Sequence, residues 1–237
     1  MRAAREIHPL RPRSRGACSR GASARAAPRG PASRQPLLAS LAVPVGSCRR
    51  NPVFTIGHSN RSVTELIALL GEAGADLVAD VRAFPRSRAN PQFNGPALQE
   101  ELHGAAMAYR YLPALGGRRH GRKADSPNTL WRNGSFRAYA DYAGTTEFRA
   151  GLARLCALAG EHRCAVMCAE AVWWRCHRRI IADYLLAAGF KVVHILGSGK
   201  LTPATLTPGA QPGAGGGLVY PPSTSLEPGL AGERRRL

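Results

Sequence analysis

Short apolar runs alternate with helix-like segments from about residue 52 onward. The apolar runs are four or five residues long, and they occupy residues 53–56, 77–81, 109–112, 165–168 and 192–196. Helix-like patterns fill most of the space between them, at residues 62–73, 97–107, 136–142, 147–161 and 177–188. Apolar strands without polar alternation are typical of parallel sheets that are covered on both faces. We therefore predict a three-layer α/β fold with a largely parallel five-stranded sheet and helices on both faces.

Local signals set the ends of several of these elements. Ser62 is followed three residues later by Glu65, which is the pattern of a helix-initiating capping box. Gly74 and Gly189 stand where two of the helices should end. We expect one α/β domain over residues 52–222.

Both ends of the chain have a different composition. Residues 1–51 are rich in Arg, Ala, Pro and Ser without periodicity, which predicts a disordered tail, and residues 223–237 are expected to be a flexible tail. The first tail holds 11 arginines against one glutamate, a net of +10 out of the formal +18. Most of the basic charge therefore says little about the partners of the folded domain, although a basic tail can bind nucleic acid or membrane surfaces by charge alone.

The remaining composition bounds the location. No apolar run approaches the roughly 20 residues of a membrane helix, so no membrane partner is expected. Without the apolar core of a secretory signal, the six cysteines are expected to be reduced thiols in a cytoplasmic protein.

Polar residues follow the predicted strands closely. Ligands of open parallel sheets bind beyond the carboxyl ends of the strands, so a functional site is expected at these positions. His58 follows the first strand, Asp80 and Arg82 end the second, and Arg86 comes shortly after. Arg119 follows the third strand. A structural Asp80–Arg82 ion pair and a solvated basic surface are the alternative interpretations of these residues.

The segment from Cys168 to Arg178 carries the strongest signal. It leaves a buried strand and enters a helix near His177, where unpaired backbone N–H groups favour an anion. A cysteine beside a helix start, His and Arg has a lowered pKa, which fits Cys176. Trp173 and Trp174 offer flat surface for stacking a base, or else cover the core.

The candidate residues fall into three groups. The predicted catalytic residues are Cys168, Glu170, Cys176 and His58. The predicted anion-binding residues are Arg82, Arg175, Arg178 and His177. Further ligand contacts are expected from Asp80, Arg86, Arg119 and Trp174. No cofactor is predicted. Zinc is the alternative, because Cys168, Glu170, Cys176 and His177 are residue types that suit it and His58 could be a further ligand, but their spacing does not match a zinc knuckle.

Five long motifs resemble a known family. They are TIGHSNRSV (55–63), DVRAFPRSRANPQFN (80–94), LPALGGRR (112–119), SPNTLWRNGSFRAYADY (126–142) and VMCAEAVWWRCHR (166–178). Together they resemble the bacterial domain-of-unknown-function family 488 from Val53 to about Pro222. Membership implies no established reaction.

A second, fold-level resemblance is to rhodanese-type sulfurtransferases. It rests on a strand ending in Asp-Val-Arg and on a later strand followed by a cysteine, a loop, an arginine and a helix. This resemblance implies Cys168 as the nucleophile and Arg175 or Arg178 as the anion clamp. The present loop is longer and contains Glu170, unlike the rhodanese pattern.

Three functional hypotheses follow. The leading one is an intracellular enzyme acting on an anionic, phosphate-bearing or nucleotide-like ligand through a reactive thiol, with Glu170 and His58 moving protons. The second is a module that binds single-stranded nucleic acid with basic loops and the tryptophan pair. The third is sulfur transfer through Cys168.

Overall fold

The computed structural model describes residues 51–119, 121 and 123–222. The predicted tails, residues 1–51 and 223–237, lie outside this part of the chain except for Asn51. None of the helices in the described ranges has the length and apolar character needed to cross a membrane.

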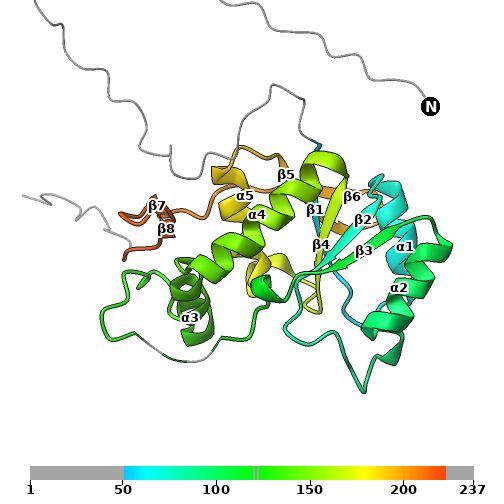
Figure 1. Ribbon diagram of the computed structural model, residues 1–237, viewed down its shortest axis with the longest axis horizontal. Coiled ribbons are helices and arrows are strands. Elements are labelled where there is room, and N and C mark those ends of the chain that lie inside the picture. Colours follow the sequence, from blue (N-terminus) through cyan, green and yellow to red (C-terminus); the bar gives the residue numbers. More distant parts are fainter. Residues whose placement is uncertain (1–50, 120, 122, 223–237) are drawn as a thin grey trace, which may run out of the picture. The chain divides into compact units, whose positions relative to one another are not determined.

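A six-stranded sheet organises the domain (Figure 1). Its strands are β1 (Val53–Gly57), β2 (Leu77–Asp80), β3 (Ala108–Tyr111), β4 (Cys164–Cys168), β5 (Val192–Gly197) and β6 (Lys200–Pro203). Their order across the sheet is β3-β2-β4-β1-β5-β6, and the first five are parallel. The predicted α/β fold and its five parallel strands are confirmed.

The sixth strand, β6, is a correction to the prediction of five. It runs antiparallel to β5 at the edge of the sheet, where Pro203 is tolerated because its missing N–H is not needed by another strand. All four residues of β6 are exposed, so the segment lacks the apolar run by which the inner strands were recognised. A separate two-stranded ribbon joins β7 (Gln211–Pro212) to β8 (Leu218–Val219).

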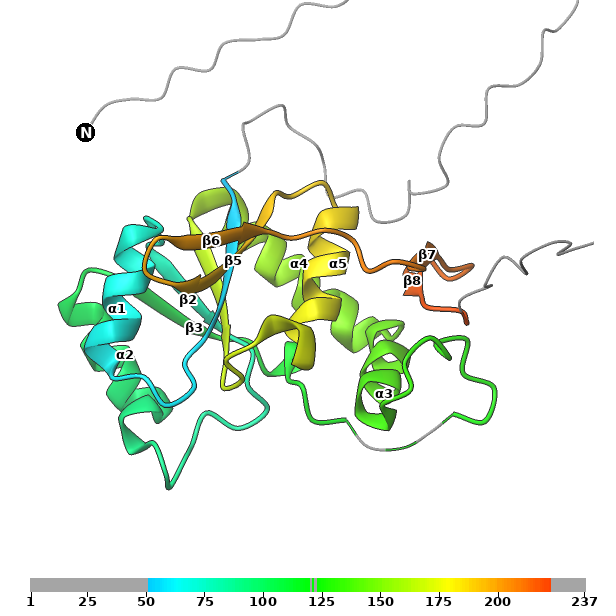
Figure 2. The same cartoon turned by 180° about the vertical axis from the view of Figure 1, so that it is seen from behind.

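Helices cover both faces of the sheet (Figures 1 and 2). The cluster on one face contains α1 (Val63–Glu72) and α2 (Gly95–Gly104), and that on the other contains α3 (Gly134–Ala143), α4 (Thr146–Glu161) and α5 (Arg178–Ala187). Side chains of β4 alternate between the two clusters, and all five of its residues are buried. Burial on both sides explains why this strand reads as a continuous apolar run.

The predicted helix boundaries follow from local contacts. Ser62 Oγ accepts a hydrogen bond from the Glu65 backbone N–H at 3.0 Å and begins α1. Gly74 and Gly189 follow α1 and α5 with φ of 70° and 83°, a conformation that favours glycine at helix ends.

The chain beyond β6 packs back onto α5. Tyr220 is fully buried, and its hydroxyl donates to Asp183 Oδ2 at 2.9 Å. The other carboxylate oxygen of Asp183 accepts from the Thr207 N–H at 2.8 Å, and the Tyr220 N–H donates to Asn128 Oδ1 at 2.9 Å. The segment that contains Thr207 and Tyr220 is therefore part of the packed domain.

Tyr220→Ala should lower the free energy of unfolding by about 3–5 kcal/mol, because it leaves a cavity and removes a partner of buried Asp183. Tyr220→Phe should cost only about 1–2 kcal/mol, since the ring stays in place. Urea denaturation measures both values. Equal losses for the two variants would contradict a role for ring packing.

Candidate functional site

The carboxyl ends of three neighbouring strands meet at one cavity. Because β4 lies between β2 and β1, the residues that follow these strands are adjacent in space. The cavity has a volume of about 800 Å³ and is bordered by His58, Arg82, Arg86, Gly117, Arg118, Cys168, Glu170, Arg175, Cys176 and His177, among others. Most of the predicted site residues thus converge on one place, as the strand-end rule requires.

Two thiols touch at the wall of this cavity. The Sγ atoms of Cys168 and Cys176 lie 2.8 Å apart, and the two side chains are 2% and 3% exposed. Burial and the hydrogen bond to Cys176 raise the pKa of Cys168 well above its usual value. Burial also acts to raise the pKa of Cys176, but the bond from Cys168 and the neighbouring His177 and Arg178 outweigh it and lower that pKa well below the usual value. Of the two thiols, Cys176 is therefore the one that loses its proton more readily.

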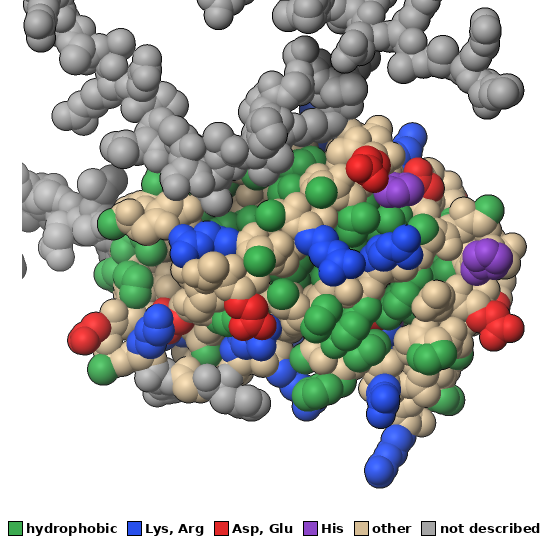
Figure 3. Space-filling model, viewed as in Figure 1, with side chains coloured by type: hydrophobic (Ala, Val, Ile, Leu, Met, Phe, Trp, Pro, Cys, Tyr) green, Lys and Arg blue, Asp and Glu red, His purple; other side chains and the backbone are tan. Residues whose placement is uncertain are grey.

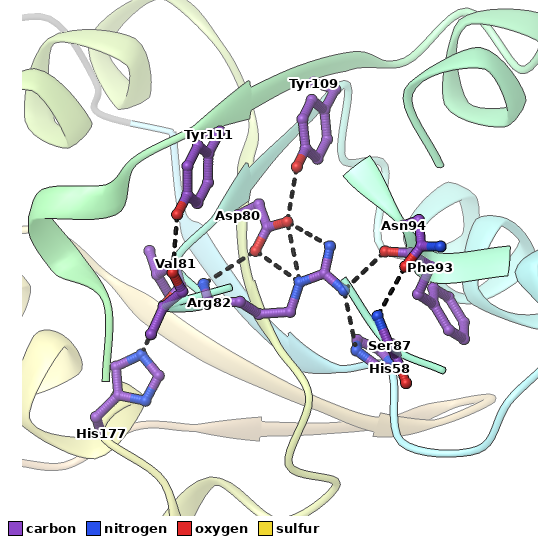
Figure 4. Close-up of polar contacts among 11 residues, drawn as sticks. His58, Asp80, Val81, Arg82, Ser87, Phe93, Asn94, Tyr109, Tyr111 and His177 are labelled. Atoms are coloured by element: carbon purple, nitrogen blue, oxygen red, sulfur yellow. Dashed lines mark hydrogen bonds and ion pairs between the residues drawn. The ribbon is translucent and has the colours of Figure 1, made fainter. Parts of the chain in front are cut away.

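His177 is oriented toward Cys176 by the backbone of the second strand end. Its Nε2 lies 2.9 Å from the Val81 carbonyl oxygen (Figure 4). Because that oxygen can only accept, Nε2 is protonated and donates the hydrogen bond. Nδ1 lies 3.4 Å from Cys176 Sγ and is left to accept the thiol proton. A thiol–imidazole contact of this kind is how cysteine nucleophiles are activated.

Arg178 lies behind the thiols and is 1% exposed. Its Nε donates to Cys176 Sγ at 3.4 Å, and its NH2 donates to the Glu170 carbonyl oxygen at 2.6 Å. A Cβ at Gly57 would lie 1.8 Å from that carbonyl oxygen, so only glycine allows β1 to approach the loop. Arg178 thus holds the loop after β4 and adds positive charge next to Cys176.

Asp80 and Arg82 form a buried ion pair, as the alternative interpretation of the sequence held. Arg82 NH2 lies 2.6 Å from Asp80 Oδ2, and Tyr109 donates its hydroxyl to the same oxygen at 2.7 Å (Figure 4). Arg82 NH1 donates to the Phe93 carbonyl oxygen at 2.8 Å. Protein groups therefore occupy every nitrogen of the Arg82 guanidinium.

His58 is held in one neutral form. Its Nδ1 donates to the Ser59 carbonyl oxygen at 2.9 Å, and its Nε2 faces Arg82 NH1 at 3.4 Å. Its ring stacks on Phe93 with centroids 4.1 Å apart. Burial lowers the pKa of His58 to about 4.

The remaining charges on the cavity wall are mostly positive. Arg86, Arg118 and Arg175 are exposed, and no ion pair is recorded for them within the described part of the chain. Glu170 is the one carboxylate among the described residues that border the cavity. Phe84, 66% exposed, lies beneath the Arg118 guanidinium at 5.8 Å. Three cations against one anion favour a negatively charged ligand.

Four predicted residues lie away from the cavity surface. Asp80 and Arg178 are buried beneath it. Arg119 stacks on Tyr142, with its Cζ 3.7 Å from the ring centroid, and Trp174 is 48% exposed outside the cavity.

Trp173 and Trp174 do not form a shared exposed stacking surface. The Trp173 ring packs on buried His194 with centroids 4.2 Å apart and an interplanar angle of 10°. On the face shown in Figure 3, basic side chains (blue) are interspersed with apolar ones (green) instead of forming a continuous stripe.

Several residues at the cavity were not predicted. Tyr139 packs edge-on against His177, with ring centroids 5.1 Å apart, and donates its hydroxyl to the Leu115 carbonyl oxygen at 2.8 Å. Ser135 and Phe136 border the cavity from the start of α3. In the sequence these residues belong to an amphipathic helix, and nothing in that pattern shows that its first turns reach the sheet edge.

The donor atoms of Cys168, Cys176 and His177 all lie within 4.8 Å of one another, and these residue types bind zinc. Two thiolates on a tetrahedral zinc ion would lie about 3.8 Å apart, given Zn–S bonds of about 2.3 Å. The observed separation of 2.8 Å is shorter than this, and Arg178 Nε donates a hydrogen bond to Cys176 Sγ.

The fold and the strand-end cavity define an α/β protein with a cysteine–histidine site. A family model, the domain of unknown function DUF488, matches residues 62–185, which is more than half of the chain. The chain belongs to this family, as its motifs predicted. Searches of curated proteins and of solved structures find no match, and the resemblance to rhodanese-type proteins gains no support from them.

Gly117→Ala should abolish the enhanced reactivity of Cys176, because a Cβ at this position would lie 2.3 Å from His177 Nδ1 and displace the ring. Gly160→Ala is the matched control, since its Cβ meets no atom within 4 Å. Alkylation rates of Cys176 at pH 7, followed by peptide mass spectrometry, measure the effect. If Cys176 in Gly117→Ala is alkylated as fast as in the parent chain, the role of His177 is contradicted.

Acid should destabilise the domain through two buried histidines. Burial lowers the pKa of His58 and of His194 to about 4, so both stay neutral in the folded state while the unfolded chain takes up protons. The free energy of unfolding should fall between about pH 6.5 and pH 4, by roughly 2–3 kcal/mol for each histidine. His194→Gln should reduce this loss by the part assigned to one histidine. His103→Gln, at an exposed position, should leave the loss unchanged. Denaturation curves between pH 4 and pH 8 provide the comparison, and equal slopes for the two variants would refute the assignment.

Proposed function

We propose that this protein is an enzyme that binds a small anionic ligand in the strand-end cavity and attacks it through the Cys176 thiolate. The observation that carries the proposal is the contact of Cys176 with three groups that stabilise its negative charge. These are the Cys168 thiol at 2.8 Å, His177 Nδ1 at 3.4 Å and Arg178 Nε at 3.4 Å. A thiolate is the reactive form of cysteine, and a cavity beside it gives a ligand room to approach.

The rim arginines are the proposed ligand-binding groups. Arg86, Arg118 and Arg175 border the cavity and have no recorded ion pair in the described ranges, whereas Arg82 and Arg178 are occupied by protein partners. An arginine can grip a phosphate or carboxylate with two parallel hydrogen bonds. We therefore assign anion binding to these three rim arginines and not to Arg82 and Arg178, which the sequence had suggested.

Proton transfer is assigned to His177 and Glu170. His177 Nδ1 accepts the Cys176 proton while its Nε2 stays bonded to Val81. Glu170 faces the cavity and can exchange protons with a ligand or with water. His58, which was expected to act as an acid or base, is proposed instead to keep Arg82 in place, because both of its ring nitrogens face protein groups.

Two alkylating reagents, one anionic and one neutral, test the proposal. Iodoacetate is an anion, and iodoacetamide is a neutral reagent of similar size. In a Cys18→Ser, Cys48→Ser background, Cys176 should be alkylated at pH 7 much faster than buried Cys156 and Cys164, which report general unfolding. Arg118→Gln and Arg175→Gln should each lower the iodoacetate-to-iodoacetamide rate ratio about threefold to fivefold, or ~0.7–1 kcal/mol.

Arg88→Gln is the matched control, because Arg88 is exposed and does not border the cavity. Its rate ratio should equal that of the parent chain, and added salt should reduce the differences among the variants. The proposal fails if Cys176 reacts no faster than Cys156 and Cys164. The ligand-binding part fails if the rim variants and Arg88→Gln give the same ratio.

A further inference from the structure

The nucleophile proposed above has a second thiol in contact with it. Cys168 Sγ lies 2.8 Å from Cys176 Sγ, so a closure of about 0.8 Å would bring the sulfurs to the length of a disulfide bond. The two residues come from different elements, since Cys168 ends β4 and Cys176 follows the short helix η4 (Trp173–Arg175). To form the bond, the segment between them, residues 169–175, would have to adjust.

We propose that Cys176 and Cys168 form a dithiol that exchanges with a small anionic disulfide, with Cys176 as the attacking thiol and Cys168 as the resolving thiol. This inference rests on the proposed function, because it takes Cys176 as the nucleophile. It adds the class of substrate, the reaction and a second catalytic residue.

The first step forms a mixed disulfide. The Cys176 thiolate, whose proton is held by His177 Nδ1, attacks one sulfur of the substrate disulfide. A bond forms between Cys176 Sγ and that sulfur while the substrate S–S bond breaks. The leaving thiolate takes the proton from His177 and departs as a thiol.

The second step closes the internal disulfide. Cys168 loses its proton to His177 or Glu170 and attacks Cys176 Sγ, which releases the second half of the substrate as a thiolate that is then protonated. The Glu170 N–H lies 3.3 Å from Cys168 Sγ and stabilises the charge that develops there. In total, one substrate disulfide and two protein thiols become one protein disulfide and two substrate thiols, so atoms and electrons balance.

The environment of the pair separates the two roles. Arg178 Nε and His177 Nδ1 both lie 3.4 Å from Cys176, whereas the direct partners of Cys168 are Cys176 and the backbone of Glu170. The attacking thiol should be the one whose charge is stabilised before the substrate arrives. This arrangement assigns attack to Cys176.

The cavity sets the substrate's size and charge. A volume of about 800 Å³ suits a small molecule, and the unpaired arginines on its border favour acidic groups. Arg118 and Arg175 both border the cavity and come from different segments of the chain, so we expect each to bind a carboxylate of one half of the disulfide. A cationic disulfide would meet like charge at the same place.

Three disulfides of different charge test the inference: oxidised glutathione (anionic), hydroxyethyl disulfide (neutral) and cystamine (cationic). Each is reacted with the full chain carrying Cys18→Ser and Cys48→Ser, and rates are divided by those of free cysteine to remove intrinsic differences. Oxidised glutathione should exceed hydroxyethyl disulfide by about tenfold at low salt, and cystamine should be slowest. The product should be the internal Cys168–Cys176 disulfide, located by peptide mass spectrometry.

Two variants separate the roles of the thiols. Cys168→Ser should accumulate the mixed disulfide on Cys176, because no resolving thiol remains. Cys176→Ser should form a mixed disulfide much more slowly than Cys168→Ser does, because the attacking thiol is missing. Buried Cys156 and Cys164 should stay unmodified in both variants, which controls for unfolding.

The outcomes distinguish this inference from the proposed function. If Cys176 is alkylated rapidly but Cys168→Ser traps no mixed disulfide and the parent chain forms no internal disulfide, the exchange reaction is refuted and the proposed nucleophile stands. If Cys176 reacts with neither alkylating reagents nor disulfides, both fail. Cystamine reacting as fast as oxidised glutathione would overturn the anionic substrate class.

Discussion

The buried guanidinium of Arg178 constrains the whole site. It is 1% exposed, and no carboxylate is recorded as its ion-pair partner in the described ranges. A buried cation is costly without compensating charge and hydrogen bonds. Carbonyl oxygens of the loop after β4 accept hydrogen bonds from it, and Cys176 Sγ accepts a further one. Burial acts to lower the pKa of Arg178, but the two cysteines outweigh it and raise that pKa. Arg178 thus acts to lower the pKa of Cys176, and the two cysteines raise the pKa of Arg178.

The contacts of Arg178 also determine the conformation of the surrounding chain. Because the Arg178 NH2 group binds the Glu170 carbonyl oxygen, the loop after β4 must fold back toward α5. That carbonyl fits only because Gly57 leaves no Cβ in its way. The Asp80–Arg82 pair plays the corresponding part at the next strand end, where it fixes His58 and the segment that contains Phe93. The two buried arginines are thus structural supports, whereas Arg86, Arg118 and Arg175 have no ion pair among the described residues.

The sequence predicted the architecture better than it predicted the roles. Apolar runs located all five parallel strands, and Ser62, Gly74 and Gly189 located helix ends, because burial and capping act over a few residues. The exposed strand β6 was missed since its pairing with β5 leaves no apolar signature. The rule that ligands bind at the carboxyl ends of parallel strands correctly predicted that His58, Arg82, Cys168 and Cys176 border one cavity. It could not say which arginines face the cavity, because Arg82 and Arg178 are paired with groups from other segments, and sequence spacing carries no information on such contacts.

The short distance between the thiols also decides how they can be charged. Two thiolates 2.8 Å apart would repel strongly in a buried site, so the pair holds one shared proton more readily than none. Arg178 and His177 both lie on the Cys176 side, which favours the negative charge on Cys176 and the proton on Cys168. The proposed exchange requires this asymmetry between an attacking and a resolving thiol. In that proposal, the same buried cation that shapes the loop favours Cys176 as the attacking thiol.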